Sequence, residues 1–443
     1  MASTNIKLPN TDEPLEEEAV PGYDPAHFYQ IDPGDVIGNG RYSVVSKLGW
    51  GRHSTVWLAR DVQRWRWQSP RYVSIKINSC DEDPESIQQQ YALLQRLTKA
   101  DPNHRGFSTV RKALESFELK TGSGTHVCIV YEPLRETMDV YRRRFAEGRL
   151  PLPLLKAYTK VLLAGLDLLH QDCGIIHTGR IHCGIRLKSD RLMDPLTADL
   201  KLDNILVGFE DESVLKLKAA QFQTSENLFK QGTGRRIYQS RSDFGPLQSY
   251  ITPPVIGDLD SAEDVDMGAH PTQPDVYRAP EVVLGWGWSS SADIWNLGHL
   301  VWTLASGKDL FTSLYTEKGT YDAAKHLAQM IAVLGPPSPT LIQERSHSGW
   351  KWSPAIVNQD GDLCEDARSF YRGPFFESTS GEFLYPKAVP LPQSLDDLAG
   401  FINTAEERAK FVDFLGKMLS WDPTQRLSER MLFDHEWLDL EPS

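Results

Sequence analysis

The sequence has no long apolar run and little cysteine. Its most apolar stretch, residues 152–169, contains Lys156, Lys160 and Asp167, which indicates an amphipathic helix and not a membrane span. The five cysteines are scattered and lack the spacing of metal ligands, so we expect reduced thiols. Residues 1–18 are polar and acidic, without the apolar core of a secretory signal. We therefore expect no transmembrane segment and a location in the cytoplasm, the nucleus or both.

Positive charge is the scarcer sign. The chain has 47 Lys and Arg residues against 60 Asp and Glu residues, for a formal net charge of -13. Such a balance argues against direct binding to nucleic acid or to an anionic membrane, and it favours a basic partner. We expect a monomer. With 443 residues, 40% of them hydrophobic, the chain has room for two lobes that share one cleft.

The order of the predicted elements indicates a two-lobed α+β protein. Residues 1–35 predict a flexible tail, residues 36–131 a strand-rich small lobe, and residues 132–443 a mostly helical large lobe. Residues 208–250 are polar and irregular, which predicts a long loop. The predicted strands span 42–45, 55–59, 72–77 and 127–131, and the predicted helices follow Pro84 and cover 155–169 and 292–304.

Two glycines lie between the first two predicted strands. Gly49 and Gly51 let the backbone lie close over phosphate groups and offer N–H donors to them. An ordinary hairpin turn is the alternative. Lys76, on the next strand, could hold the α- and β-phosphates of ATP, although a lone lysine on a strand usually lies on a solvated face. Its spacing from Gly51 favours the nucleotide site.

The pattern Asp-x-Lys-x-x-Asn occurs just before a short apolar strand, at residues 199–206. Phosphoryl transfer needs an acceptor for the proton of the substrate hydroxyl, a cation at the moving phosphate and an oxygen ligand for a metal. Asp199, Lys201 and Asn204 supply these three groups. A chance occurrence is the alternative, and the specificity of the pattern argues against it.

Two further motifs complete the set. They are Tyr-Arg-Ala-Pro-Glu at 277–281, followed by Ser-Ala-Asp-Ile-Trp at 291–295, and Asp-Pro-Thr-Gln-Arg at 422–426. In this order, the five motifs across residues 36–438 resemble the signature set of the protein kinases. Within the kinases, the chain resembles the SR-protein kinase family, most closely its fungal-type members, in residues 48–57, 175–178, 373–376 and 381–384.

The resemblance implies a bilobal kinase fold that uses MgATP to phosphorylate serine in Arg/Ser-rich proteins. It implies catalytic roles for Asp199 and Lys201, and magnesium binding by Asn204 and Asp258. It also implies a buried ion pair between Glu281 and Arg426. The nucleotide-binding residues that it implies are Gly49, Gly51, Ser54, Val56, Lys76, Glu132, Leu134 and Asn204.

The first departure from the family pattern is an insertion. In the family a His-Thr pair runs directly into Asp-x-Lys-x-x-Asn, whereas here the 20 residues 179–198 separate Thr178 from Asp199. One interpretation is a retained intron, since removing these residues leaves the family pattern uninterrupted from His177 to Asn204. The other is a real loop, exposed and poorly ordered. A real loop would displace His177, and a displacement of about 1 Å can cost roughly 100-fold in rate.

A second departure concerns the metal-binding aspartate. The literal string Asp243-Phe244-Gly245 follows a polar segment and precedes a proline. Asp258 follows a short apolar strand, as a ligand at the floor of a cleft should, so we assign magnesium to Asp258. Leu259 and Asp260 stand after it in place of the usual Phe-Gly.

A third departure places Gln90 where the family carries a glutamate that pairs with the strand lysine. Glutamine can hydrogen-bond Lys76 but supplies no charge.

Two functions are consistent with these departures. The first is an active serine/threonine kinase, favoured by Lys76, Asp199 and Asn204. The alternative is a pseudokinase that binds basic partners without efficient catalysis, favoured by Gln90 and the insertion.

Overall fold

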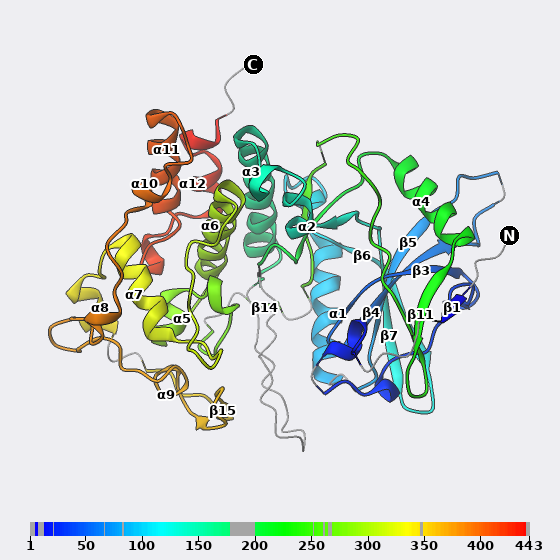
Figure 1. The fold of residues 1–443 in the computed structure, drawn as a ribbon, viewed down its shortest axis with the longest axis horizontal. Helices are drawn as coiled ribbons and strands as arrows, with labels where there is room; N and C mark the ends of the chain where they lie inside the picture. The colour runs from blue at the N-terminus through cyan, green and yellow to red at the C-terminus, as the bar shows by residue number, and fades with distance from the viewer. Residues whose placement is uncertain are drawn as a thin grey trace.

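A six-stranded antiparallel sheet, with strand order β2-β3-β4-β5-β7-β6, forms the small lobe (Figure 1). The computed structural model describes residues 5–7, 13–20, 22–65, 67–81, 84–177, 200–250, 252–259, 262–264, 268–345 and 349–439. The sheet consists of β2 (Val36–Ile37), β3 (Tyr42–Gly51), β4 (Ser54–Asp61), β5 (Tyr72–Asn78), β6 (Ala113–Lys120) and β7 (Thr125–Tyr131), with helix α1 (Pro84–Lys99) beside it. The predicted strands and the helix after Pro84 are confirmed.

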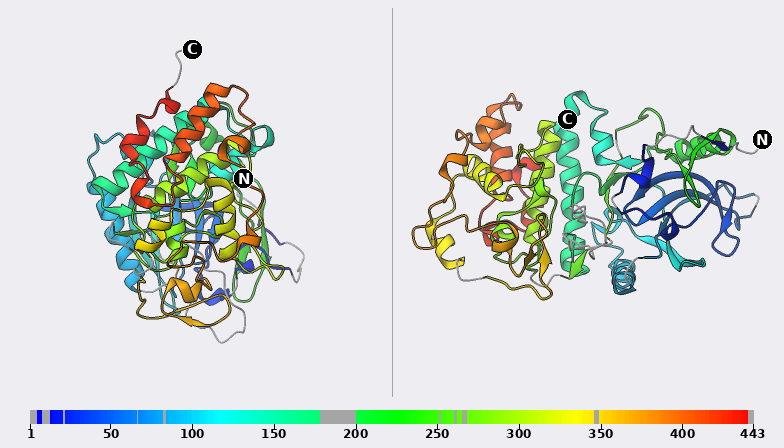
Figure 2. Two further views of the ribbon diagram at one scale, coloured as in Figure 1. Left: turned by 90° about the vertical axis from the view of Figure 1, so that its left-hand side faces the viewer. Right: turned by 60° about the horizontal axis from the view of Figure 1, so that its bottom comes forward.

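Both faces of this sheet are covered. On one face, Trp57, Ile75 and Val130 pack against Phe229 and Tyr238 from a segment far along the chain. On the other face, the strand residues Val127 and Ile129 pack against α1, and this face also borders the large lobe (Figure 2). This double cover explains why six of the seven residues of β5 are buried.

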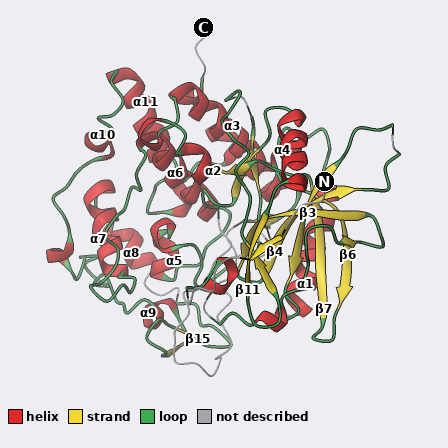
Figure 3. Cartoon of the chain, turned by 45° about the vertical axis from the view of Figure 1, so that its right-hand side comes forward, coloured by secondary structure: helices red, strands yellow, loops and turns green. Residues whose placement is uncertain are grey.

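The large lobe is mostly helical and packs around α3 (Leu152–Asp167) and α6 (Ser291–Ser306), close to the predicted helices (Figure 3). Its other helices are α2 (Met138–Arg142), α5 (Pro280–Leu284), α7 (Ala323–Leu334), α8 (Pro339–Arg345), α9 (Ala367–Phe370), α10 (Leu395–Leu398), α11 (Ala405–Gly416) and α12 (Glu429–Phe433). No helix in the described ranges is both long and apolar enough to span a bilayer.

Short strands at the boundary between the two lobes position residues of the candidate site. β10 (Ile205–Val207) lies between β8 (Glu136–Thr137) and β13 (Pro254–Ile256) in an antiparallel sheet. Because β10 and β13 are paired, the residues just outside them are brought together. The remaining short strands pair as β9 (Ile175–Ile176) with β14 (Glu263–Asp264) and β15 (Ile356–Val357) with β16 (Leu363–Cys364).

The prediction of a flexible tail over residues 1–35 is wrong for the described residues 13–20 and 22–35. The Glu17 carboxylate is fully buried and pairs with Lys47 and with Arg235, 2.9 Å from its Nη2. A buried carboxylate is tolerated only when it is paired in this way. Strand β1 (Asn5–Lys7) also pairs in parallel with β11 (Asn227–Gln231).

The prediction of a long loop over residues 208–250 is wrong as well. This segment, which we call the insert, contains α4 (Glu212–Thr224), β11 and β12 (Arg236–Tyr238). Asp211 caps α4 by accepting a hydrogen bond from the Ser213 N–H. Val214 and Phe222 of α4 pack against Val45 of β3, so the insert leaves the large lobe and folds onto the small one (Figure 1).

Candidate active site

A cavity of 470 Å³ lies between the sheet and the large lobe. Its volume falls in the range of small-molecule sites, about 300–1,000 Å³. Val56, Leu134 and Leu206 give part of its lining an apolar surface that suits a purine ring. Elsewhere the lining carries Lys76, Asn204 and Asp258. An apolar part and a charged part in one cavity match the two parts of a nucleotide.

The glycine-containing turn forms the edge of the cavity. Gly49, Gly51, Ser54 and Val56 all line it, with Gly51 paired to Ser54 across the β3–β4 hairpin. A Cβ atom built on Gly49 would meet no atom within 4 Å. Nothing inside the chain therefore requires glycine there, whereas a ligand that approaches the backbone closely would.

The cation and the two oxygen ligands predicted from the motifs line the same cavity. Lys76 Nζ lies 3.7 Å from Asp258 Oδ1. Asn204 and Asp258 are brought together because they flank β10 and β13, and the Gly257 N–H donates to the Asn204 carbonyl at 2.8 Å. Asp258 has a φ of 55°, in the left-handed region. This backbone aims a carboxylate into the cavity at the end of a strand.

A carboxylate and an amide oxygen are ligands that magnesium prefers, with phosphate oxygens and water completing its coordination. The described residues contain no group of three or more His, Cys, Asp or Glu side chains that could hold a metal without such help. Asn204 and Asp258 therefore fit a magnesium ion that arrives with a nucleotide.

His177 is fixed beside this pair. It is fully buried, its N–H donates to Asp293 Oδ2 at 2.8 Å, and its Nε2 lies 2.9 Å from the Gly257 carbonyl. The expectation that a real insertion would displace His177 is thus not met. The insertion itself, residues 179–198, and Asp199 lie outside the described residues.

Two predicted site residues are not among the described residues that line the cavity. The Glu132 side chain is exposed and accepts a hydrogen bond from Arg71 at 2.5 Å. Lys201 is partly buried, and its carbonyl accepts the Asn204 N–H at 2.9 Å in the turn that leads into β10. Leu134, which was also predicted to bind the nucleotide, does line the cavity. It lies in residues 132–135 between β7 and β8, which we call the hinge.

Gln90 lines the cavity and is 3% exposed. Its Oε1 accepts a hydrogen bond from Asn78 Nδ2 at 3.3 Å.

The sequence did not indicate a further cation at the cavity, Arg111. Its guanidinium lies 4.3 Å from the centre of the Tyr131 ring and donates to Ser74 Oγ at 3.4 Å. Burial lowers the pKa of Arg111 and raises that of Tyr131 to about 12. No motif marked Arg111, because it follows a loop of ordinary composition.

Asp243 of the string Asp243-Phe244-Gly245 is not among the described residues that line the cavity. The exposed Asp243 carboxylate accepts the Gly245 N–H at 2.8 Å, and Phe244 is buried against Phe209 with ring centres 4.8 Å apart. Phe244 and Ser242 line the cavity, a role that the sequence did not indicate. No local pattern marks them, because Phe244 meets Phe209 and Phe222 only in the folded insert.

The fold and the cavity together define a protein kinase. A family model described as "Protein kinase domain" matches residues 256–438. A solved crystal structure of a kinase domain has a TM-score of 0.63 at 20% identity, and the match covers 94% of this chain and 100% of that one, which supports the fold.

Proteins of similar sequence identify the family within the protein kinases. A serine/threonine protein kinase of Aspergillus fumigatus is 31% identical over 439 residues, which cover 98% of this chain and 94% of the relative. The serine/threonine-protein kinase SRPK of Physarum polycephalum is 31% identical over 436 residues, covering 96% and 92%. The chain therefore belongs to the SR-protein kinase family and is a serine/threonine protein kinase. The pseudokinase alternative receives no support from these comparisons.

Proposed function

We propose that the chain transfers the γ-phosphate of ATP to serine side chains in Arg/Ser-rich proteins. The observation that carries the proposal is the meeting of Lys76, Asn204 and Asp258 in one cavity that also has an apolar part. A net charge of -13 supports a basic substrate, since opposite charges raise the rate of encounter. The relatives named SRPK point to the same substrate class. We also propose the cytoplasm or the nucleus as the location.

The chemistry is an in-line displacement at the γ-phosphorus. The substrate hydroxyl oxygen forms a bond to phosphorus, the bond to the β–γ bridging oxygen breaks, and the hydroxyl proton passes to Asp199. Lys201 neutralises charge on the transferred group, and Lys76 holds the α- and β-phosphates. Magnesium, held by Asn204 and Asp258, supplies further charge compensation when bound. The Gly49–Gly51 turn covers the phosphates, so most of the catalytic effect is positioning and electrostatics.

The test compares three peptides of equal length: an Arg/Ser repeat, a Lys/Ser repeat and a Gln/Ser repeat. We expect phosphorylation of the first, with kcat/KM at least about tenfold lower for the second, because a guanidinium donates through a planar fork that an ammonium lacks. Added salt should weaken binding of the Arg/Ser peptide through screening. Equal kcat/KM for all three peptides would refute the Arg/Ser preference and leave the kinase activity standing.

A further inference from the structure

A segment of the insert reaches the nucleotide cavity from outside the two lobes. We call residues 240–246 the insert strap. Two of its residues, Ser242 and Phe244, line the cavity together with Leu48 of β3 and Leu134 of the hinge. Ser242 is exposed, whereas Phe244 is 3% exposed. The strap therefore borders the same cavity as Leu48 and Leu134.

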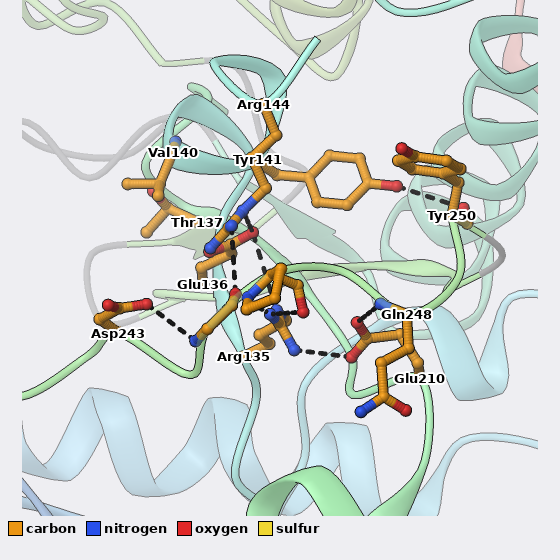
Figure 4. Close-up of polar contacts among 12 residues, drawn as sticks. Arg135, Glu136, Thr137, Val140, Tyr141, Arg144, Glu210, Asp243, Gln248 and Tyr250 are labelled. Atoms are coloured by element: carbon orange, nitrogen blue, oxygen red, sulfur yellow. Dashed lines mark hydrogen bonds and ion pairs between the residues drawn. The ribbon is translucent and has the colours of Figure 1, made fainter. Parts of the chain in front are cut away.

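The large-lobe side of the strap is held by Arg135, one residue after Leu134 (Figure 4). The Arg135 side chain is fully buried and pairs with Glu210 at 2.7 Å. Its Nη2 also donates to the carbonyls of Gly245 at 2.5 Å and Pro246 at 3.2 Å. One guanidinium thus connects the hinge, the start of the insert and the strap.

A second arginine reinforces this attachment. Arg144 donates to the Gly245 carbonyl at 3.2 Å, and it forks onto the Glu136 carboxylate at 2.6 and 2.5 Å (Figure 4). Two cationic donors on one carbonyl hold the peptide at a defined position, since charge-assisted hydrogen bonds are stronger than neutral ones.

The small-lobe side of the strap is fixed as well. The Arg241 N–H donates to the Lys47 carbonyl at 2.8 Å, directly before the glycine turn. The Arg241 side chain bonds Ser225 Oγ at 2.5 Å and stacks over the Phe222 ring at 4.2 Å. Glu16 of the N-terminal segment accepts the Ser240 N–H at 3.0 Å. The strap is therefore tied to both lobes.

We infer that the insert strap is a wall of the nucleotide site and that Arg135 is the residue that positions it. A wall that is already ordered loses little conformational entropy when a ligand binds, so it adds to ligand affinity. It borders the cavity beside Leu48 and Leu134, and the bonds described above join it to Arg135, Arg144 and Lys47. The strap should consequently affect the binding of ATP and leave the chemical step nearly unchanged.

The first test introduces a large side chain where the strap borders the cavity. Ser242→Trp places a large side chain at the cavity mouth, and Gln239→Trp is the matched control, because Gln239 is exposed, lies next to the strap and is not among the described cavity residues. Calorimetric titration with MgATP should show affinity at least tenfold weaker for Ser242→Trp and within twofold of the parent for Gln239→Trp. Equal affinity of the two variants would overturn the inference. A parent protein that bound no MgATP would instead refute the nucleotide site of the proposed function.

The second test addresses Arg135. Arg135→Met should raise the KM for ATP at least fivefold while kcat stays within twofold, because uniform binding is lost and not transition-state stabilisation. Arg135→Lys keeps a charge beside Glu210 but not the fork to two carbonyls, so its KM should be intermediate. If Arg135→Met does not fold, the double variant with Glu210→Met removes the stranded carboxylate and carries the same expectation. An unchanged KM for ATP, or a proportional fall of kcat, would show a merely structural role.

Discussion

Arg426 donates two hydrogen bonds to the carboxylate of Glu281, each 2.6 Å long. Both side chains are completely buried, and the Arg426 guanidinium also lies 4.9 Å from the centre of the Trp295 ring. The pair joins α5 to the turn before α12, 145 residues further along the chain. It confirms the expectation that the motifs at 277–281 and 422–426 meet in the large lobe.

Replacing one partner of this pair should destabilise the large lobe. Glu281→Gln leaves the guanidinium buried without a counter-charge, which costs about 3–5 kcal/mol in buried pairs. We expect a loss of that size in the free energy of unfolding, measured with urea. The double variant Glu281→Met/Arg426→Met should recover most of the loss. A single variant as stable as the parent protein would contradict the expectation.

The two candidate metal-binding aspartates should differ sharply on substitution. Asp258→Asn removes a charge that lies in the cavity beside Lys76, so phosphoryl transfer should fall by at least about 100-fold. Asp243→Asn keeps an oxygen that can accept the Gly245 N–H and should retain most activity. The measurement is kcat/KM at saturating magnesium, and the reverse ranking would assign the metal to Asp243.

The strands of the small lobe and the long helices of the large lobe follow from local pattern, which is why they could be predicted. The insert could not. Val214, Ala219 and Phe222 of α4 are buried only because the segment returns to β3, and no local period indicates that return. Asp211 is a readable helix start, yet thirteen residues of weakly amphipathic sequence do not stand out from a polar loop.

The prediction of a flexible N-terminal tail was wrong for a related reason. Glu17 reads as a solvated charge in an acidic tail, but its partners Lys47 and Arg235 lie 30 and 218 residues away. At the candidate site, Lys76 and Asn204 were predicted from the spacing of their motifs, and Asp258 from the short apolar strand before it. Arg135 belongs to no motif, since its role depends on the folded position of the strap.

A buried histidine should make stability depend on pH. Burial alone would lower the pKa of His170, but hydrogen bonds to Asp293 and Glu429 outweigh it and raise the pKa to about 9. His299 is the opposite case, because burial lowers its pKa to about 3. Its contribution to the pH dependence of stability therefore lies at lower pH, between about 3 and 6.5.

The sign for His170 follows from linkage. Its stabilising contribution is fully present below its unfolded pKa of about 6.5 and is lost as pH rises through about 9. We expect the difference in unfolding free energy between the parent and His170→Gln to shrink over this window, by on the order of 3 kcal/mol at most. The measurement is urea unfolding at several pH values. A difference that did not vary with pH would contradict a raised pKa.

Deleting residues 179–198 should raise activity and stability. The deletion joins Thr178 directly to Asp199, which restores the family pattern and removes the entropic cost of closing a longer loop. His177, buried and bonded to Asp293 and Gly257, provides a fixed start for the shortened connection. Activity and melting temperature of the two forms decide the matter, and equal or lower activity of the shortened form would identify the insertion as a functional element.

Asp199→Asn tests the general base. The substitution preserves the shape of the side chain but removes its charge and its basicity, so the hydroxyl proton of the substrate loses its acceptor. We expect MgATP affinity within a few-fold of the parent protein and phosphoryl transfer lower by at least about 100-fold, the scale of a general base. The assay uses the Arg/Ser peptide and is run in the full chain and in the form without residues 179–198, so that the effect of the base is separated from that of the insertion. If the shortened form binds MgATP and the peptide but transfers no phosphate, and Asp199→Asn changes nothing, Asp199 is not the base and the proposed mechanism is refuted.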